Sequence, residues 1–321
     1  MAYCKHSTNT LSFHQDNVRF CTTLQEGPVI SNYRENAEQL AELIIDAKRK
    51  AFEEVPAECS DCIYRVQEEP TEKKITRIDL FYWYHCNCGC FYCSYRDKTK
   101  GRFSDEVLEG NSLIYQTVKN LYARDMISRE NLFVVWGGGE VGVLKEFPQL
   151  MDLFLKNNVN FIWCETSAVR YSDSIAKMLE RGKGGMTAAV CCGSRDVYKK
   201  IKQRDKYEQV MQNLAKYVRS ANKYKDNKKN PENVISKFII LEGFNNNKNE
   251  VEKWVLESKK YGLKRIEISM EFCWGIHTKK GQPIEDYNYE LFDYAEKMCK
   301  DEGLAFNRND TSARLMEQGI Y

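Results

Sequence analysis

Short apolar runs rich in β-branched residues alternate with amphipathic stretches from residue 77 onward. Six runs have the composition of strands buried on both faces, and they cover residues 77–85, 131–136, 160–167, 186–192, 235–242 and 265–273. Apolar residues at three-to-four spacing predict helices over residues 105–123, 144–157, 173–181, 207–222, 248–261 and 289–301. Six consecutive βα units predict an α/β fold, a partial (β/α)6 barrel of the TIM type, with its chemistry at the carboxyl ends of the strands.

The first 76 residues do not share this alternation. Residues 10–22 predict a β-hairpin that turns at Asp16 and Asn17, and residues 33–53 predict a helix. We therefore expect three parts: a small cysteine-rich N-terminal module over residues 1–76, the barrel over residues 77–303, and a C-terminal tail over residues 304–321.

Composition excludes some classes of protein. The 48 basic and 46 acidic side chains nearly cancel, which disfavours a nucleic-acid partner. The chain has neither a signal-peptide pattern at its start nor a run of 18 apolar residues, so we expect a cytoplasmic protein without a membrane partner. The cytosol would keep the 13 cysteines reduced, which favours metal ligation or thiol chemistry over disulfides.

A cysteine cluster follows the first strand of the predicted barrel, in the string "HCNCGCFYCSY". Cys86, Cys90 and Cys93 are separated by three and then two residues. Three thiolates on so short a loop can hold three irons of a cubane [4Fe-4S] cluster and leave the fourth iron open. Tetrahedral zinc is the alternative, although it requires a fourth ligand. Cys88 also lies close enough in the sequence to be a ligand, but the spacing of three and then two residues favours Cys86 as the first ligand.

The loop resembles the signature of the radical S-adenosylmethionine (SAM) family, including an aromatic residue, Tyr92, directly before the last cysteine. The resemblance extends over residues 77–303. It implies that the open iron chelates the amine and carboxylate of SAM, and that one electron cleaves SAM to a 5′-deoxyadenosyl radical. It also implies a flavodoxin- or ferredoxin-type electron donor as a partner.

A glycine-rich turn ends the second strand, in the string "VVWGGGEVG". Glycine lets the backbone approach a ligand closely, and a carboxylate beside it can accept hydrogen bonds from an ammonium group. Gly138, Gly139 and Glu140 are similar to the Gly-Gly-Glu motif of the same family, which binds the amino group of SAM. Val141 stands where the family usually has proline.

Later strands resemble the family more loosely. Thr166 and Ser167, at the end of the third strand, are candidate contacts to the ribose or carboxylate of SAM. Ala189 and Cys191 occupy the places of the Ser-x-Asp pair that usually ends the fourth strand. Asn245 is a candidate in the loop after the fifth strand.

The N-terminal module has enough cysteines for one closed site: Cys4, Cys21, Cys59 and Cys62. A hairpin followed by a C-x-x-C knuckle resembles the SPASM and twitch modules, which hold an auxiliary [4Fe-4S] cluster. In those relatives the module usually follows the barrel, whereas here it precedes it. Structural zinc and unligated thiols are the alternatives.

The fate of a substrate radical depends on what lies beside it. An auxiliary cluster would oxidise it, giving dehydrogenation or a cross-link, whereas a thiol would return a hydrogen atom and give an epimer. Cys273, or one of Cys191 and Cys192, is the predicted hydrogen donor, because these residues end the sixth and fourth predicted strands. The substrate would be a peptide, a sugar or another small molecule. The alternative function is a non-catalytic iron-sulfur or zinc-binding scaffold.

Overall fold

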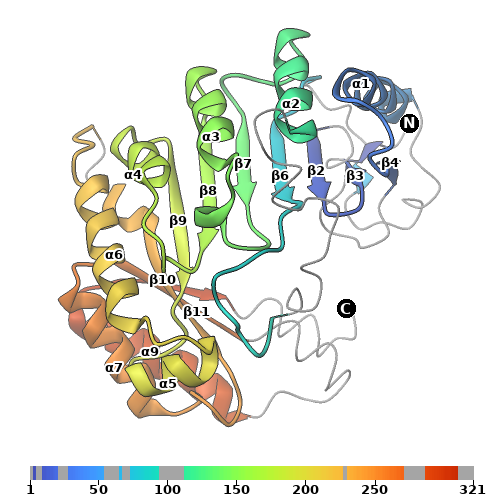
Figure 1. Cartoon of the computed structure of the whole chain (residues 1–321). Coiled ribbons are helices and arrows are strands. Elements are labelled where there is room, and N and C mark those ends of the chain that lie inside the picture. The colour runs from blue at the N-terminus through green and yellow to red at the C-terminus, as the bar shows by residue number, and fades with distance from the viewer. Residues whose placement is uncertain are drawn as a thin grey trace. The chain divides into compact units, whose positions relative to one another are not determined.

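The computed structural model (Figure 1) describes residues 3–4, 9–20, 28–53, 65–66, 73–93, 112–226, 230–270 and 286–309. The chain forms two compact units, each built from two segments. Unit 1 comprises Met1–His85 and Lys100–Cys164, and unit 2 comprises Cys86–Thr99 and Glu165–Tyr321. The chain thus passes from unit 1 to unit 2 directly after His85 and again directly after Cys164.

Unit 1 is built around strands that run in the order β8-β7-β6-β2-β3-β4. These strands are β2 (Thr10–His14), β3 (Val18–Arg19), β4 (Val29–Ser31), β6 (Arg77–Phe81), β7 (Phe133–Trp136) and β8 (Phe161–Thr166). The pairs β2·β6, β6·β7 and β7·β8 are parallel, whereas β3 pairs antiparallel with β2 and with β4. Strands β1 (Tyr3–Cys4) and β5 (Arg65–Val66) form a separate antiparallel pair.

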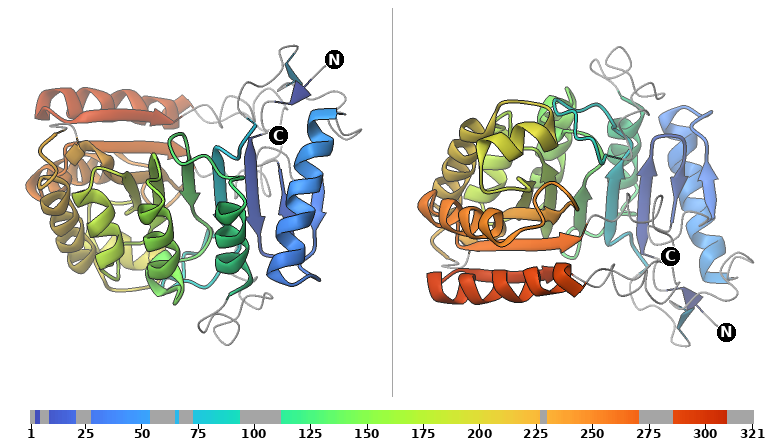
Figure 2. Two further views of the ribbon diagram at one scale, coloured as in Figure 1. Left: turned by 90° about the horizontal axis from the view of Figure 1, so that it is seen from above. Right: turned by 90° about the horizontal axis from the view of Figure 1, so that it is seen from below.

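In the described residues of unit 1, three α-helices accompany this sheet: α1 (Ala37–Glu53), α2 (Leu113–Ala123) and α3 (Phe147–Lys156), with a 3-10 turn, η3 (Val141–Val143), after β7. Helix α2 buries Ile114, Val118 and Leu121, whose spacing places them on one face. The views in Figure 2 show α1 and α2 side by side.

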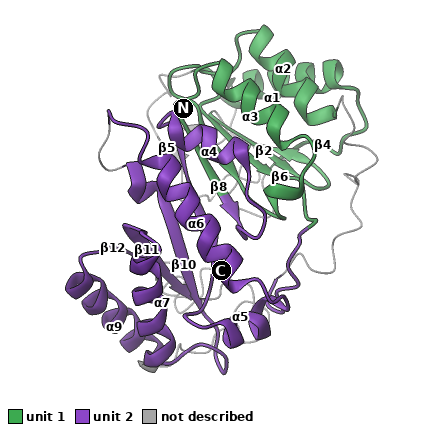
Figure 3. Ribbon diagram, turned by 60° about the vertical axis from the view of Figure 1, so that its left-hand side comes forward, with its two compact units in different colours: residues 1–85, 100–164 green, residues 86–99, 165–321 purple. Residues whose placement is uncertain are grey.

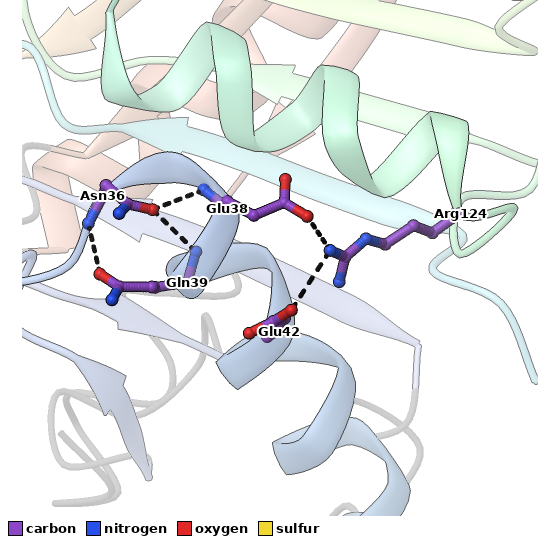
Figure 4. A network of polar contacts seen from close by, with 5 residues as sticks. All are labelled: Asn36, Glu38, Gln39, Glu42 and Arg124. Carbon is purple, nitrogen blue, oxygen red and sulfur yellow. Dashed lines mark hydrogen bonds and ion pairs between the residues drawn. The ribbon is translucent and has the colours of Figure 1, made fainter.

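A polar network joins the ends of these two helices (Figure 4). The side-chain oxygen of Asn36 accepts hydrogen bonds of 3.0 Å from the backbone N–H groups of Glu38 and Gln39, which explains why α1 begins at this point. Arg124, just after α2, forms ion pairs with Glu38 and Glu42 on α1. The network therefore fixes the N-terminal turn of α1 against the C-terminal end of α2.

Unit 2 contains a fully parallel sheet in the order β9-β10-β11-β12. Its strands are β9 (Gly184–Ala189), β10 (Val234–Ile240), β11 (Arg265–Met270) and β12 (Ala305–Asn309). Its helices are α4 (Asp173–Glu180), α5 (Arg195–Lys202), α6 (Tyr207–Ala221), α7 (Lys248–Lys260) and α9 (Asp286–Glu302), with the 3-10 turn η4 (Asn230–Asn233). The core gathers Phe238 and Ile268 of the strands with Trp254 and Phe292 of the helices. Figure 3 distinguishes the two units by colour.

All six predicted barrel strands are present, and their pairings within each unit are parallel. The predicted α/β fold with a parallel sheet is confirmed. Strands β6, β8, β9 and β10 end one to four residues before the end of their predicted runs, because the run continues into the loop at the carboxyl end of the strand. Among the helices that the structure describes, none has the length and apolar character to cross a membrane.

The ends of the chain differ from the expected division. The predicted hairpin is present, but its strand β2 also pairs in parallel with β6, with Thr10 opposite Arg77. Residues 10–14 therefore extend the sheet of the barrel and do not stand apart from it. Within the expected tail, residues 305–309 form β12, which pairs with β11. Both β2 and β12 pair with strands that are distant in the sequence, and a local sequence pattern cannot predict such a pairing.

Candidate functional site

The cysteine loop belongs to unit 2 and is attached there through its backbone. Gly89 donates its N–H to the carbonyl oxygen of Lys202 at 3.0 Å, and Phe91 donates to that of Ile201 at 3.4 Å. The Phe91 ring stacks on Phe244 with a centroid separation of 4.2 Å. The end of α5 thus supports the middle of the loop.

Three of the four thiols in this loop, those of Cys86, Cys88 and Cys90, interact with one another. Cys86 is exposed, and Cys88, Cys90 and Cys93 are half-buried. A hydrogen bond with the Cys86 thiol is the main reason that the pKa of Cys88 rises to about 11, and a hydrogen bond with Cys88, together with burial, raises the pKa of Cys90. The structure therefore brings Cys86, Cys88 and Cys90 together, with Cys88 between the other two.

The described part of the loop offers four thiols, a donor set that fits an iron-sulfur cluster. Within the described ranges, no set of three or more His, Cys, Asp or Glu side chains converges on a point where a single metal ion would sit. The ligands of a cubane cluster need not meet at one point as the ligands of a single ion must, because each thiolate binds a separate iron. The residues present fit a cluster, and the central position of Cys88 keeps Cys88 in competition as a ligand.

The Gly-Gly-Glu turn belongs to unit 1 and packs on the segment that follows β6. Gly139 donates its N–H to the carbonyl oxygen of Trp83 at 2.6 Å, and Glu140 donates to that of His85 at 2.8 Å. A Cβ atom on Gly139 would lie 2.4 Å from the His85 carbonyl oxygen, and one on Gly138, whose φ is 97°, would lie 2.7 Å from that of Trp83. The close approach that requires glycine is therefore to another stretch of backbone, the one that ends just before Cys86.

Glu140 is buried, with 1% of its surface exposed. Its Oε1 atom accepts a hydrogen bond from the Gly142 N–H at 2.8 Å and so caps the 3-10 turn η3. In this structure the carboxylate organises its own loop.

Thr166 and Ser167 follow different patterns of contact. The Thr166 hydroxyl accepts from the Ala168 N–H at 3.0 Å, within its own turn. The Ser167 hydroxyl donates to the side-chain oxygen of Asn87 at 3.0 Å. Since Asn87 lies between two of the clustered cysteines, Ser167 is the member of this pair that the structure brings to the cysteine loop.

Cys191 and Cys192 are both fully buried. Strand β9 ends at Ala189, and Cys191 has a positive φ of 66°, so the two cysteines lie beyond the strand and their side chains do not alternate as in a strand. Cys192 donates to a carbonyl oxygen two residues back, and burial raises its pKa well above its usual value. The Cys191 Sγ atom lies 3.4 Å from the Tyr92 hydroxyl and 3.4 Å from Lys202 Nζ.

Asn245 is fully buried and holds backbone groups. Its side-chain oxygen accepts from the Leu241 N–H at 2.7 Å, and its amide nitrogen donates to the carbonyl oxygens of Cys191 and Ile239 at 2.6 and 2.7 Å. Asn245 therefore fastens the ends of β9 and β10, a structural role.

Several predicted site residues lie outside the described residues: Cys21, Cys59, Cys62 and Cys273. Cys4 lies in β1, but its side chain is not described. The auxiliary site and the hydrogen donor at Cys273 stay predictions.

Sequence reasoning missed Lys202, which is 3% exposed and contacts Tyr92. Helix α5 has three lysines in its last turn, at positions 199, 200 and 202. Nothing in the string "YKKIKQ" shows which of the three is buried, because that depends on how α5 packs.

No family model matches the sequence, and no curated protein matches it significantly. Solved structures do match. SuiB of Streptococcus suis bound to S-adenosylmethionine has a TM-score of 0.54 and 10% identity, over 87% of this chain and 57% of SuiB. SuiB bound to precursor peptide SuiA has a TM-score of 0.53 and 9% identity, over 90% of this chain and 57% of SuiB.

A radical SAM methyltransferase from Sphaerobacter thermophilus also matches, with a TM-score of 0.46 and 15% identity, over 71% of this chain and 66% of that one. This chain spans little more than half the length of SuiB. At such identities the likeness concerns the fold. The partial-barrel α/β fold predicted from the sequence is therefore the fold that this chain shares with SuiB.

Proposed function

We propose that this chain is a radical SAM enzyme, which cleaves SAM reductively and abstracts a hydrogen atom from its substrate. The observation that carries the proposal is the loop with Cys86, Cys90 and Cys93, which follows the first barrel strand β6 in a fold shared with SuiB. The alternative of a scaffold without turnover lacks a specific observation in its favour.

In this proposal the three thiolates hold a [4Fe-4S] cluster, which would supply the electron for SAM cleavage. Ser167 contacts the cysteine loop through Asn87 and is placed to bind a polar group of SAM. Glu140 would accept hydrogen bonds from the SAM ammonium, and for this its carboxylate would have to engage the ligand as well as the Gly142 N–H.

The outcome of the reaction is a finer proposal. We propose oxidation or cross-linking if Cys4, Cys21, Cys59 and Cys62 hold an auxiliary cluster, and epimerisation if a thiol returns a hydrogen atom. Cys273 is the first candidate for that thiol, because Cys192 is fully buried and bonded to its own backbone. Single alanine variants of Cys273, Cys191 and Cys192, followed by deuterium uptake at the product carbon, test the donor; undiminished label in all three rejects it.

Peptides are the first substrate class to test, because SuiB was solved with a precursor peptide bound. Sugars and other small molecules are the next classes. A flavodoxin- or ferredoxin-type protein would be the electron donor, and dithionite can replace it in the assay.

The decisive experiment is anaerobic reconstitution with iron and sulfide, followed by dithionite and SAM. We expect 5′-deoxyadenosine from the native chain, and none from alanine variants of Cys86, Cys90 or Cys93. Cys88→Ala should retain the product if the spacing identifies the ligands correctly. Cys299→Ala removes a cysteine from the core of α9 and is the matched control.

Metal content completes the experiment. About four irons per chain indicate the SAM-binding cluster alone, and about eight indicate an auxiliary cluster as well. Four irons with one zinc would assign zinc to the N-terminal cysteines. A full cluster that yields no 5′-deoxyadenosine would reject the proposed function.

A further inference from the structure

A buried lysine lies behind the cysteine loop. Lys202 is the last residue of α5, and only 3% of its surface is exposed. Its ammonium nitrogen donates a hydrogen bond of 2.8 Å to the Tyr92 hydroxyl and lies 3.4 Å from the Cys191 sulfur. Lysine is rarely buried to this extent, because removing an ammonium group from water is costly unless nearby groups compensate.

The position of this ammonium group is fixed relative to the loop. The backbone carbonyl oxygens of Lys202 and Ile201 accept hydrogen bonds from loop residues 89 and 91. Two residues further on, Arg204 donates from Nε to the carbonyl oxygen of Asn87 at 3.2 Å. One short segment therefore binds the loop at three points and also carries the buried charge.

The charge on Lys202 lies next to the cysteine loop. Its ammonium nitrogen is 2.8 Å from the Tyr92 hydroxyl and 5.2 Å from the centre of the Tyr92 ring. Because Tyr92 directly precedes the predicted ligand Cys93, the charge is close to the predicted cluster.

A cluster held by three thiolates is an anion, and each electron that it takes adds further negative charge. A fixed positive charge in a poorly solvated site stabilises the reduced state more than the oxidised state. We propose that Lys202 is a positioning residue that orients Tyr92 in the cysteine loop and raises the reduction potential of the cluster. This inference rests on the proposed function, because it requires the loop to hold a cluster.

Redox titration of the reconstituted protein, followed by electron paramagnetic resonance, tests the inference without substrate. Lys202→Met removes the charge and keeps the length of the side chain, and Lys202→Arg keeps the charge. Lys200→Met, on the exposed face of the same helix, is the matched control. We expect a roughly tenfold shift of the reduction equilibrium toward the oxidised cluster in Lys202→Met, as for a unit charge about 10 Å away at an effective dielectric constant near 20.

A tenfold shift corresponds to about 59 mV for a one-electron couple. Lys200→Met and Lys202→Arg should keep the native potential. A native potential in cluster-loaded Lys202→Met overturns the inference. If Lys202→Met takes up no cluster, the potential of Lys202→Arg is the test. A tenfold shift of the reduction equilibrium in Lys202→Arg, which retains the charge, also overturns the inference. The proposed function fails separately, through a native chain that binds no cluster or releases no 5′-deoxyadenosine.

Discussion

Replacing Gly139 by alanine tests the contact between the Gly-Gly-Glu turn and the segment before the cysteine loop. The new Cβ atom would lie 2.4 Å from the His85 carbonyl oxygen and 2.7 Å from the Tyr84 carbonyl carbon. Both are backbone atoms, so no side-chain rotation can relieve the overlap. The turn has to withdraw, which breaks the hydrogen bonds of Gly139 and Glu140 to Trp83 and His85, at 2.6 and 2.8 Å.

We expect a loss of about 3 kcal/mol, at the upper end of the range for overpacking. For a unit of this size, that corresponds to a fall in melting temperature of roughly 6–12 °C. The assay is thermal unfolding, with iron retention measured in parallel. Because His85 immediately precedes Cys86, we expect Gly139→Ala to retain less cluster.

Gly243→Ala is the control for glycine replacement as such. Gly243 has a φ of 78°, and a Cβ atom added there would meet no other atom within 4 Å, so alanine costs only conformational strain of about 1–2 kcal/mol. If Gly139→Ala loses no more stability than Gly243→Ala, the turn is not in tight contact with the backbone and the reasoning is wrong.

Two further predictions concern buried polar groups. Glu146 accepts a hydrogen bond from Tyr82, and burial raises its pKa from 4.5 to about 7, so the native state binds the extra proton and stability falls as pH rises through this window. At about 1.4 kcal/mol per pH unit, urea unfolding should show a loss between pH 5 and pH 8 that is about 2–3 kcal/mol larger in the native chain than in Glu146→Gln, and an equal loss in the two would contradict this reasoning. Asn245→Ala removes three hydrogen bonds to buried backbone groups and should cost about 3 kcal/mol or more in urea unfolding; a loss below about 1 kcal/mol would show that other groups satisfy this backbone.

The strands could be predicted because a strand that is buried on both faces consists of consecutive apolar residues, and such a run is visible in the sequence. The ends of the strands could not. Residues 82–85 are as apolar as the strand before them, yet β6 ends at Phe81. The carbonyl oxygens of Trp83 and His85 accept hydrogen bonds from the Gly-Gly-Glu turn, and so are not available to a strand ladder. That partner lies more than 50 residues away, so the local pattern could not show it.

The candidate site divides in the same way. The cysteine spacing and the Gly-Gly-Glu motif are local strings, and the sequence was enough to identify them. Asn245 was predicted as a ligand contact because its loop resembled that of the family, but its amide is engaged with backbone. The burial of Lys202 depends on the packing of a short helix, and no spacing rule distinguishes it from its exposed neighbours.

Cys191 connects the main departure from the family pattern with the buried lysine. The family pattern usually has an aspartate at the position of Cys191. An aspartate opposite Lys202 would form an ion pair with it and cancel the positive charge of Lys202. A thiol leaves that charge available to the cluster. Cys191→Asp should therefore lower the potential toward that of Lys202→Met, whereas Cys191→Ser should keep the native potential; aspartate also tolerates the positive φ of 66° at this position better than most residues. Redox titration of the two variants measures the difference, and equal potentials would mean that the partner at position 191 does not govern the field of Lys202 at the cluster.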